Sequence, residues 1–102
     1  MAELKVKEKW VKKKVVDYLK SHGLYYFFPV ASGWMSAGVP DIICCVKGRF
    51  VGIECKAGKN KPTAIQLKNH REIQLNEGHV MVINEDNLDH MKEVIDELIR
   101  SN

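Results

Sequence analysis

The sequence is short, lacks long apolar runs and contains few cysteines, and these features together favour a single compact domain in a reducing compartment. Its 102 residues are too few for two domains, so we expect residues 1–102 to form one domain. No apolar run approaches the ~18 residues of a membrane-spanning helix, and the N-terminus mixes acid and base where a signal peptide is apolar. Three cysteines, an odd number, argue against a disulfide framework. We therefore expect a cytoplasmic protein that does not act in a membrane.

The chain also has little net charge, +3, but this charge is unevenly distributed. Basic residues gather in segments 1–20 and 47–71, whereas carboxylates gather in 85–97. The basic segments could face a polyanion such as nucleic acid, or they could be the solvated faces of ordinary helices. Charge alone favours neither interpretation.

The hydropathy pattern predicts seven elements in the order α-β-β-β-α-β-α. Helical spacing of apolar residues predicts a first helix over about 3–22, ended by a glycine. Aromatic, β-branched and apolar runs predict four strands, over 24–30, 41–46, 50–56 and 79–83. Two more helices are predicted, one running to about residue 77 and one starting near 87. The predicted fold class is α/β, a small mixed sheet flanked by helices.

Three carboxylates occupy positions where the pattern predicts burial. Asp41 directly precedes an apolar strand, and Glu54 lies inside the apolar strand 50–56. Glu8 falls on the apolar stripe of the first helix, so we expect it to point inward. Buried carboxylates are costly unless they are paired or bind a metal. The three acids therefore need a common explanation.

The predicted hairpin can bring two of these acids together. With a turn at 47–48, Asp41 faces Glu54 directly; with a turn at 48–49, Asp41 faces Lys56 and Glu54 lies diagonally on the same face. Only a three-residue turn would place the two acids on opposite faces. Glu54 and Lys56 share a face in every case, because side chains alternate along a strand.

Carboxylates that converge near backbone carbonyls form an oxygen-rich site suited to Mg²⁺ or Mn²⁺. Such an ion can polarise a phosphodiester and lower the pKa of a bound water, and a nearby lysine can orient that water or offset transition-state charge. The alternative is an ordinary buried ion pair between Glu54 and Lys56. That pair would leave Asp41 and Glu8 unexplained.

The same residues resemble the signature of a nuclease superfamily. Gly38-Val39-Pro40-Asp41, followed after twelve residues by Glu54-Cys55-Lys56, is similar to the PD-(D/E)xK motif. The specific similarity is to the virus-type replication-repair branch, the VRR-NUC domain. In that branch a glutamate on the first helix and a glutamine on a later helix join the site, and Glu8 and Gln66 fall at those places. The resemblance covers nearly the whole chain and implies a restriction-endonuclease-like fold.

The resemblance implies a metal-dependent endonuclease that hydrolyses phosphodiester bonds in DNA. Asp41 and Glu54 would hold Mg²⁺ or Mn²⁺ together with the backbone carbonyl of Cys55. Glu8 would complete the acidic shell, either directly or through water. Lys56 would assist the attacking water.

Gln66 would help to order this site, although Thr63-x-x-Gln66 is also a capping box, and the two roles can coexist. Three lysines border the proposed site and are predicted to contact backbone phosphates: Lys59, Lys61 and Lys68.

Stand-alone members of the branch resemble homodimeric resolvases that cut four-way (Holliday) junctions and other branched DNA. The resemblance therefore implies such a resolvase, and a viral or prophage origin that would place it in the host cytoplasm. Two alternatives are a less structure-selective repair or restriction nuclease and a non-catalytic basic DNA-binding module. The module would have no use for three converging carboxylates.

The remaining notable residues have weaker signals. The three cysteines lack the spacing of a zinc site and are predicted to be small core residues. Lysines 12–14 are predicted to be solvated, although a substrate with several arms could reach them. Trp34 and Met35 could stack on a splayed base or pack at a dimer interface. The aromatic strand at 25–28 and the last helix are the apolar surfaces that could mediate a two-fold dimer.

Overall fold

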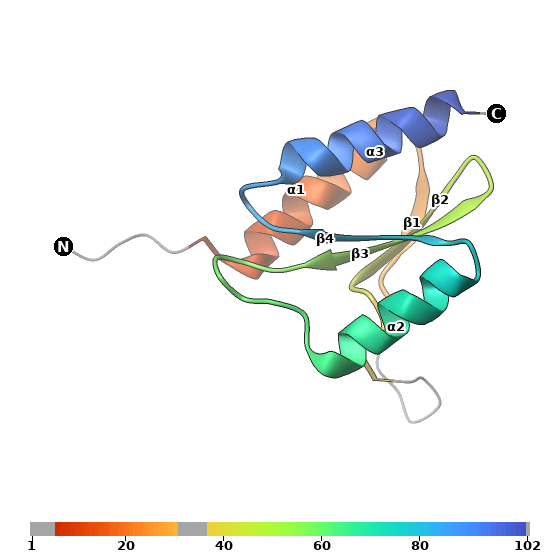
Figure 1. Cartoon of the computed structure of the whole chain (residues 1–102). Helices are drawn as coiled ribbons and strands as arrows, with labels where there is room; N and C mark the ends of the chain where they lie inside the picture. The colour runs from red at the N-terminus through yellow and green to blue at the C-terminus, as the bar shows by residue number, and fades with distance from the viewer. Residues whose placement is uncertain (1–5, 31–36, 102) are drawn as a thin grey trace.

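The structure is a computed structural model that describes residues 6–30 and 37–101, and it consists of a four-stranded sheet with helices on both faces (Figure 1). The small mixed α/β class predicted from the sequence is confirmed. In chain order the elements are α1 (Glu8–Ser21), β1 (Tyr25–Phe27), β2 (Ile42–Val46), β3 (Arg49–Cys55), α2 (Ala64–Leu75), β4 (His79–Ile83) and α3 (Leu88–Arg100).

The strands lie in the spatial order β1-β2-β3-β4. The pairs β1–β2 and β2–β3 are antiparallel, and β3–β4 is parallel. A parallel pair needs a long crossover, which α2 provides here. The strand predicted over 24–30 is shorter in the structure, and it ends just before Pro29, which has no N–H to donate to a ladder.

Helices α1 and α3 lie next to each other on one face of the sheet (Figure 1). Every second strand residue points to this face, where the apolar core of the molecule forms. The strands contribute Ile42, Cys44, Val46, Val51, Ile53, Cys55, Met81 and Ile83, and the helices contribute Val11, Val15, Leu19, Met91, Ile95 and Leu98. The apolar side of α3 is thus buried within the chain, so it is not a free surface for a dimer.

The opposite face of the sheet is packed differently, because α2 covers only its β3–β4 side. Cys45 points to this face beyond the reach of α2 and is exposed. The prediction that all three cysteines belong to the core is therefore wrong for Cys45, and correct for Cys44 and Cys55.

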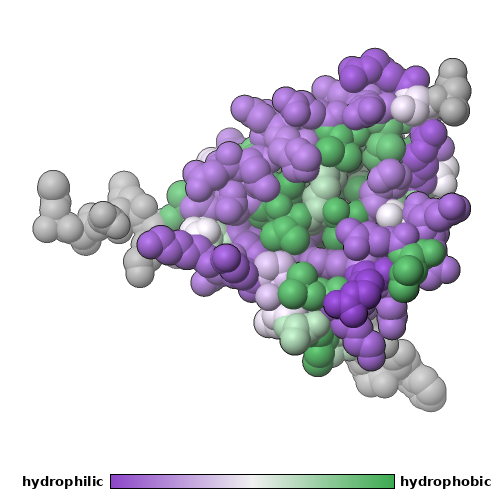
Figure 2. Space-filling view, viewed as in Figure 1, coloured by the Kyte–Doolittle hydropathy of each residue, from purple (hydrophilic) through white to green (hydrophobic). Residues whose placement is uncertain are grey.

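The outer faces of α1 and α3 are largely hydrophilic, and hydrophobic residues show between these helices and the sheet (Figure 2). Helix α2 differs, because Ile65, Leu67 and Leu75 on it are exposed. Within residues 6–30 and 37–101, no helix combines the length and the apolar character needed to cross a membrane.

Candidate active site

The β2–β3 hairpin has the two-residue turn that brings two of the predicted acids face to face. Lys47 and Gly48 both have positive φ, 51° and 84°, as the hairpin turn with the matching twist requires. Ile42 is therefore paired with Ile53, and one step further along the ladder Asp41 lies opposite Glu54. Of the registers that the sequence left open, this is the direct one.

Two close backbone approaches position Asp41 just before the start of β2. Gly38 has φ of 84° and lies so close to α2 that a Cβ there would be 2.3 Å from the Ile65 side chain. Pro40 is buried against Gly52 of β3, where a Cβ would be 2.9 Å from the proline ring. The glycine and the proline of Gly38-Val39-Pro40-Asp41 thus hold this segment between α2 and the sheet.

Asp41 is half-buried, and its carboxylate holds the end of the neighbouring strand. Its Oδ2 accepts a hydrogen bond of 2.8 Å from the backbone N–H of Cys55. The Cys55 carbonyl belongs to the residue whose N–H Asp41 binds, at the same strand end.

Glu54 is fully buried on the α2 face of β3. Its Oε2 accepts a hydrogen bond of 3.3 Å from Gln66 Nε2, and its Oε1 lies 3.2 Å from His70 Nε2. Burial, followed by the hydrogen bond and the negative charge of Asp41, raises the pKa of Glu54 to about 8, against a smaller lowering by Lys56. Glu54 is therefore the carboxyl of this pair that tends to keep its proton near neutral pH.

Gln66 combines the two roles that the sequence suggested. Its side-chain Oε1 accepts a hydrogen bond of 2.8 Å from the Thr63 backbone N–H. In return, the backbone N–H of Gln66 donates a hydrogen bond of 3.2 Å to Thr63 Oγ1. This capping box begins α2 and uses only the oxygen end of the amide. The nitrogen end remains available to hold Glu54.

His70 is a site residue that the sequence reasoning missed. It is only 5% exposed, and burial, followed by the positive charge of Lys56, lowers its pKa. A neutral imidazole can donate Nε2–H to the Glu54 carboxylate. The signal in the sequence is its spacing, because a residue four positions after Gln66 lies on the same face of the helix.

Glu8 does not point inward as predicted. It is exposed in the first turn of α1, because the helix begins at this residue and its packed face starts only at Val11. Its charge still acts on the site, since it raises the pKa values of both Glu54 and Cys55. Glu8 therefore lies at the rim of the carboxylate pair.

Lys56 follows β3 on the same face as Glu54 and is half-buried. Its charge lowers the pKa of both Glu54 and His70, which places it beside them. The three lysines predicted to contact phosphate are all exposed: Lys59 and Lys61 in the β3–α2 connection and Lys68 on α2. Trp34 and Met35, the other residues proposed to contact DNA, lie outside the described residues.

The donor set fits a hard cation with a small number of protein ligands. The described part of the chain contains no group of three or more His, Cys, Asp or Glu side chains arranged to hold a metal ion. Mg²⁺ is commonly bound through one or two carboxylates with water in its remaining positions, and Asp41, Glu54 and the Cys55 carbonyl provide such a set. Burial raises the pKa of the Cys55 thiol to about 12, so only its backbone oxygen is a suitable ligand.

No protein-family model matches the chain, and a search of curated proteins found no matching relative. The function of the site therefore has to be inferred from its geometry.

Proposed function

We propose that the chain is a divalent-metal-dependent DNA endonuclease with a restriction-endonuclease-like fold of the VRR-NUC type. The observation that carries this proposal is the burial of Glu54 opposite Asp41: burial, followed by the hydrogen bond and charge of Asp41, raises the pKa of Glu54 to about 8. A simple ion pair with Lys56 would hold that pKa below its usual value. A carboxylate pair that is unfavourable without a cation, beside a lysine, is typical of a functional site.

Each residue of the site has a defined task in this proposal. Asp41, Glu54 and the Cys55 carbonyl hold Mg²⁺ or Mn²⁺, with Glu8 joining through water. The bound ion would lower the pKa of a water molecule and stabilise the leaving oxygen of the phosphodiester. Lys56 orients the attacking water and offsets negative charge on the phosphate.

Gln66 and His70 hold the Glu54 carboxylate from the α2 side, through contacts of 3.3 and 3.2 Å. Ligands fixed in this way lose less freedom when the metal binds, and such supporting contacts commonly change metal affinity 10- to 100-fold, an order-of-magnitude range. These two residues are therefore positioning residues.

For the substrate we propose branched DNA, in particular a four-way junction, cut by a homodimer. Two cuts related by symmetry need two sites, which a two-fold dimer supplies. Edge strand β1 exposes Tyr25 and Phe27, 72% and 46% respectively, and this apolar edge suits such an interface. Lys59, Lys61 and Lys68 supply exposed positive charge for the DNA backbone.

The proposal is tested with a panel of labelled linear, flap, splayed-arm and four-way DNA, incubated with Mg²⁺ or Mn²⁺. We expect metal-dependent cleavage that EDTA abolishes, and a loss of at least ~100-fold in D41N and K56A with junction binding retained. Asp89→Asn, an exposed acid on α3, is the matched control and should cut normally.

Absence of metal-stimulated cutting in the wild type would contradict the nuclease and favour a non-catalytic DNA-binding module. Equal rates on four-way and linear DNA would contradict only the junction preference, and would favour a less selective nuclease.

A further inference from the structure

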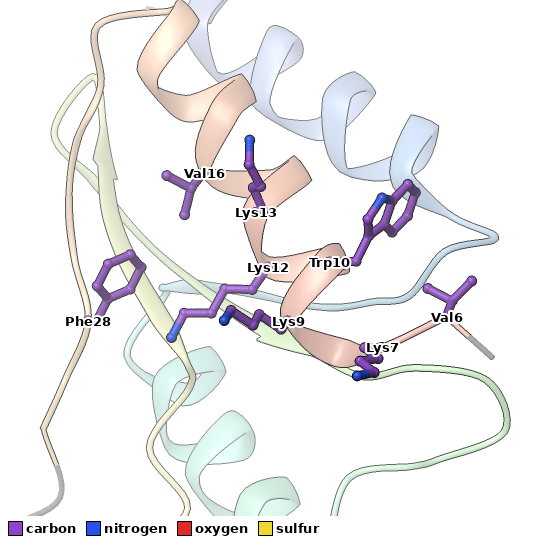
Figure 3. A pocket seen from close by; sticks show the side chains of 8 residues that line it. All are labelled: Val6, Lys7, Lys9, Trp10, Lys12, Lys13, Val16 and Phe28. Atoms are coloured by element: carbon purple, nitrogen blue, oxygen red, sulfur yellow. The ribbon is translucent and has the colours of Figure 1, made fainter. Parts of the chain in front are cut away.

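A hollow of about 840 Å³ lies along the first turns of α1 (Figure 3). Its lining combines two aromatic rings and two valines with four lysines: Trp10, Phe28, Val6, Val16, Lys7, Lys9, Lys12 and Lys13. Among residues 6–30 and 37–101, its lining contains no acidic side chain. We call this feature the α1 groove. Solvation of lysines 12–14 does not by itself explain why aromatic rings and lysines meet here.

The two rings of the α1 groove are available to a ligand. Trp10 and Phe28 are each 44% exposed, and they stand on opposite sides of the helix with lysines between them (Figure 3). Lys12 Nζ lies 4.3 Å from the centroid of the Phe28 ring, and Lys14 Nζ lies 5.3 Å from that of Trp10. Aromatic faces combined with positive charge are the elements with which proteins bind single-stranded nucleic acid.

The α1 groove also adjoins the candidate active site. Lys12 follows Glu8 by about one helical turn, so the two residues lie on neighbouring positions of the same face. Glu8 is the residue proposed to join the metal through water, so one end of the groove lies beside the rim of the candidate site.

We propose that the α1 groove binds an unpaired DNA strand, with bases stacked on Trp10 and Phe28 and phosphates neutralised by the lysines. In a branched substrate this would place an unpaired arm next to Asp41 and Glu54. The delivery of that arm to a cut rests on the proposed nuclease function, whereas the strand binding itself does not.

The pattern of charge favours this occupant over two others. A two-fold contact between copies through this patch would bring its lysines against one another. An apolar membrane surface would require burial of the lysines that stand between the two rings. A single DNA strand satisfies both features, because it presents stacking bases and negative phosphates together.

The test uses a fluorescein-labelled oligothymidine of about a dozen nucleotides, with anisotropy measured in EDTA so that no cleavage takes place. We expect W10A and F28A each to weaken binding about tenfold, and W10F, which keeps a ring, to restore most of it. K12Q and K13Q should each lower the slope of log affinity against log salt by about 0.7.

The matched controls lie on the β2–β3 hairpin. Phe50→Ala removes a ring that is exposed to nearly the same extent, 46%, and Lys47→Gln removes an exposed turn lysine; neither should change binding. Because binding is measured in EDTA, the result does not depend on whether the chain cuts DNA. Thermal melting checks that each variant is folded.

Unchanged binding in W10A and F28A would overturn the proposal. In that case two further measurements would identify what the groove binds instead. Loss of binding to vesicles that contain an anionic phospholipid would indicate a membrane surface, and loss of self-association in sedimentation would indicate a second copy of the chain.

Discussion

The two faces of the sheet are built on different principles. The face under α1 and α3 is an apolar core, to which Ile42, Ile53 and Ile83 each contribute a fully buried side chain. The face under α2 instead places Glu54 and His70, both buried, beside Pro40 and Gly52. The first arrangement stabilises the fold, whereas the second keeps an acid where it costs stability.

This difference indicates which parts of the molecule serve structure and which serve chemistry. The hydrogen bonds of Gln66 and His70 satisfy Glu54 but do not lower its pKa below the usual range. A site that is costly when empty and stabilised by a ligand is typical of function. Substitutions on the two faces should therefore have opposite effects on stability.

The largest effect is expected on the core face. Ile53→Ala removes a fully buried side chain and should lower the free energy of unfolding by about 3 kcal/mol, because a cavity is left behind. Urea denaturation followed by circular dichroism measures this. A loss below ~1 kcal/mol would mean that this face is not the close-packed core.

The next effect has the opposite sign. The pKa of Glu54 is about 8 in the folded chain, against a usual value of 4.5, so the folded state binds this proton more tightly. Its stabilising contribution is complete below pH 4.5 and is lost as the pH rises through 8. Without metal at pH 8, Glu54→Gln should therefore be more stable than the wild type by about 1–3 kcal/mol.

This gain should shrink as the pH falls toward 5, which parallel denaturation curves in EDTA would show. A Glu54→Gln protein that is less stable than the wild type at every pH would instead mean that Glu54 forms a stabilising ion pair.

The sequence contained enough information for the elements and for the pair of acids, but not for their surroundings. The motif at residues 38–41 and the Glu-x-Lys strand are local patterns, and turn chemistry at Lys47-Gly48 limits the register to a few choices. Glu8 was misjudged because helical phase does not reveal where the packed part of a helix begins. Leu4, the apolar residue one helical turn before Glu8 in the sequence, lies outside the described residues.

His70 and the α1 groove depend on tertiary packing, which local patterns do not contain. Nothing in the sequence states that α2 lies over β3 and β4, and this placement alone turns a helical histidine toward Glu54. Likewise, Phe28 meets Lys12 only because the segment after β1 runs beside α1.

A smaller effect is expected from the positioning residue on α2. His70→Ala removes the contact to Glu54 Oε1 and should weaken Mn²⁺ binding about tenfold. His70→Gln, which can still donate a hydrogen bond, should recover part of the loss. Calorimetry measures the affinities, and an unchanged Mn²⁺ affinity in His70→Ala would show that the histidine only fills space.

The smallest effect compares two adjacent residues on opposite faces. Cys44 is buried in the core, where burial raises the pKa of its thiol to about 12, whereas Cys45 is exposed. Cys45→Ser should change the free energy of unfolding by less than about 0.5 kcal/mol. In the folded wild type a thiol reagent should modify Cys45 alone, and rapid modification of Cys44 would contradict the assignment of faces.

The most direct test of the site is a calorimetric titration of Mn²⁺ into the DNA-free wild type, D41N, E54Q and the control Asp89→Asn at pH 8. We expect Mn²⁺ to bind to the wild type and to the control, with release of the proton from Glu54. We expect this binding to be lost in D41N and E54Q. Equal Mn²⁺ affinity in all four proteins would show that these carboxylates do not hold the cation.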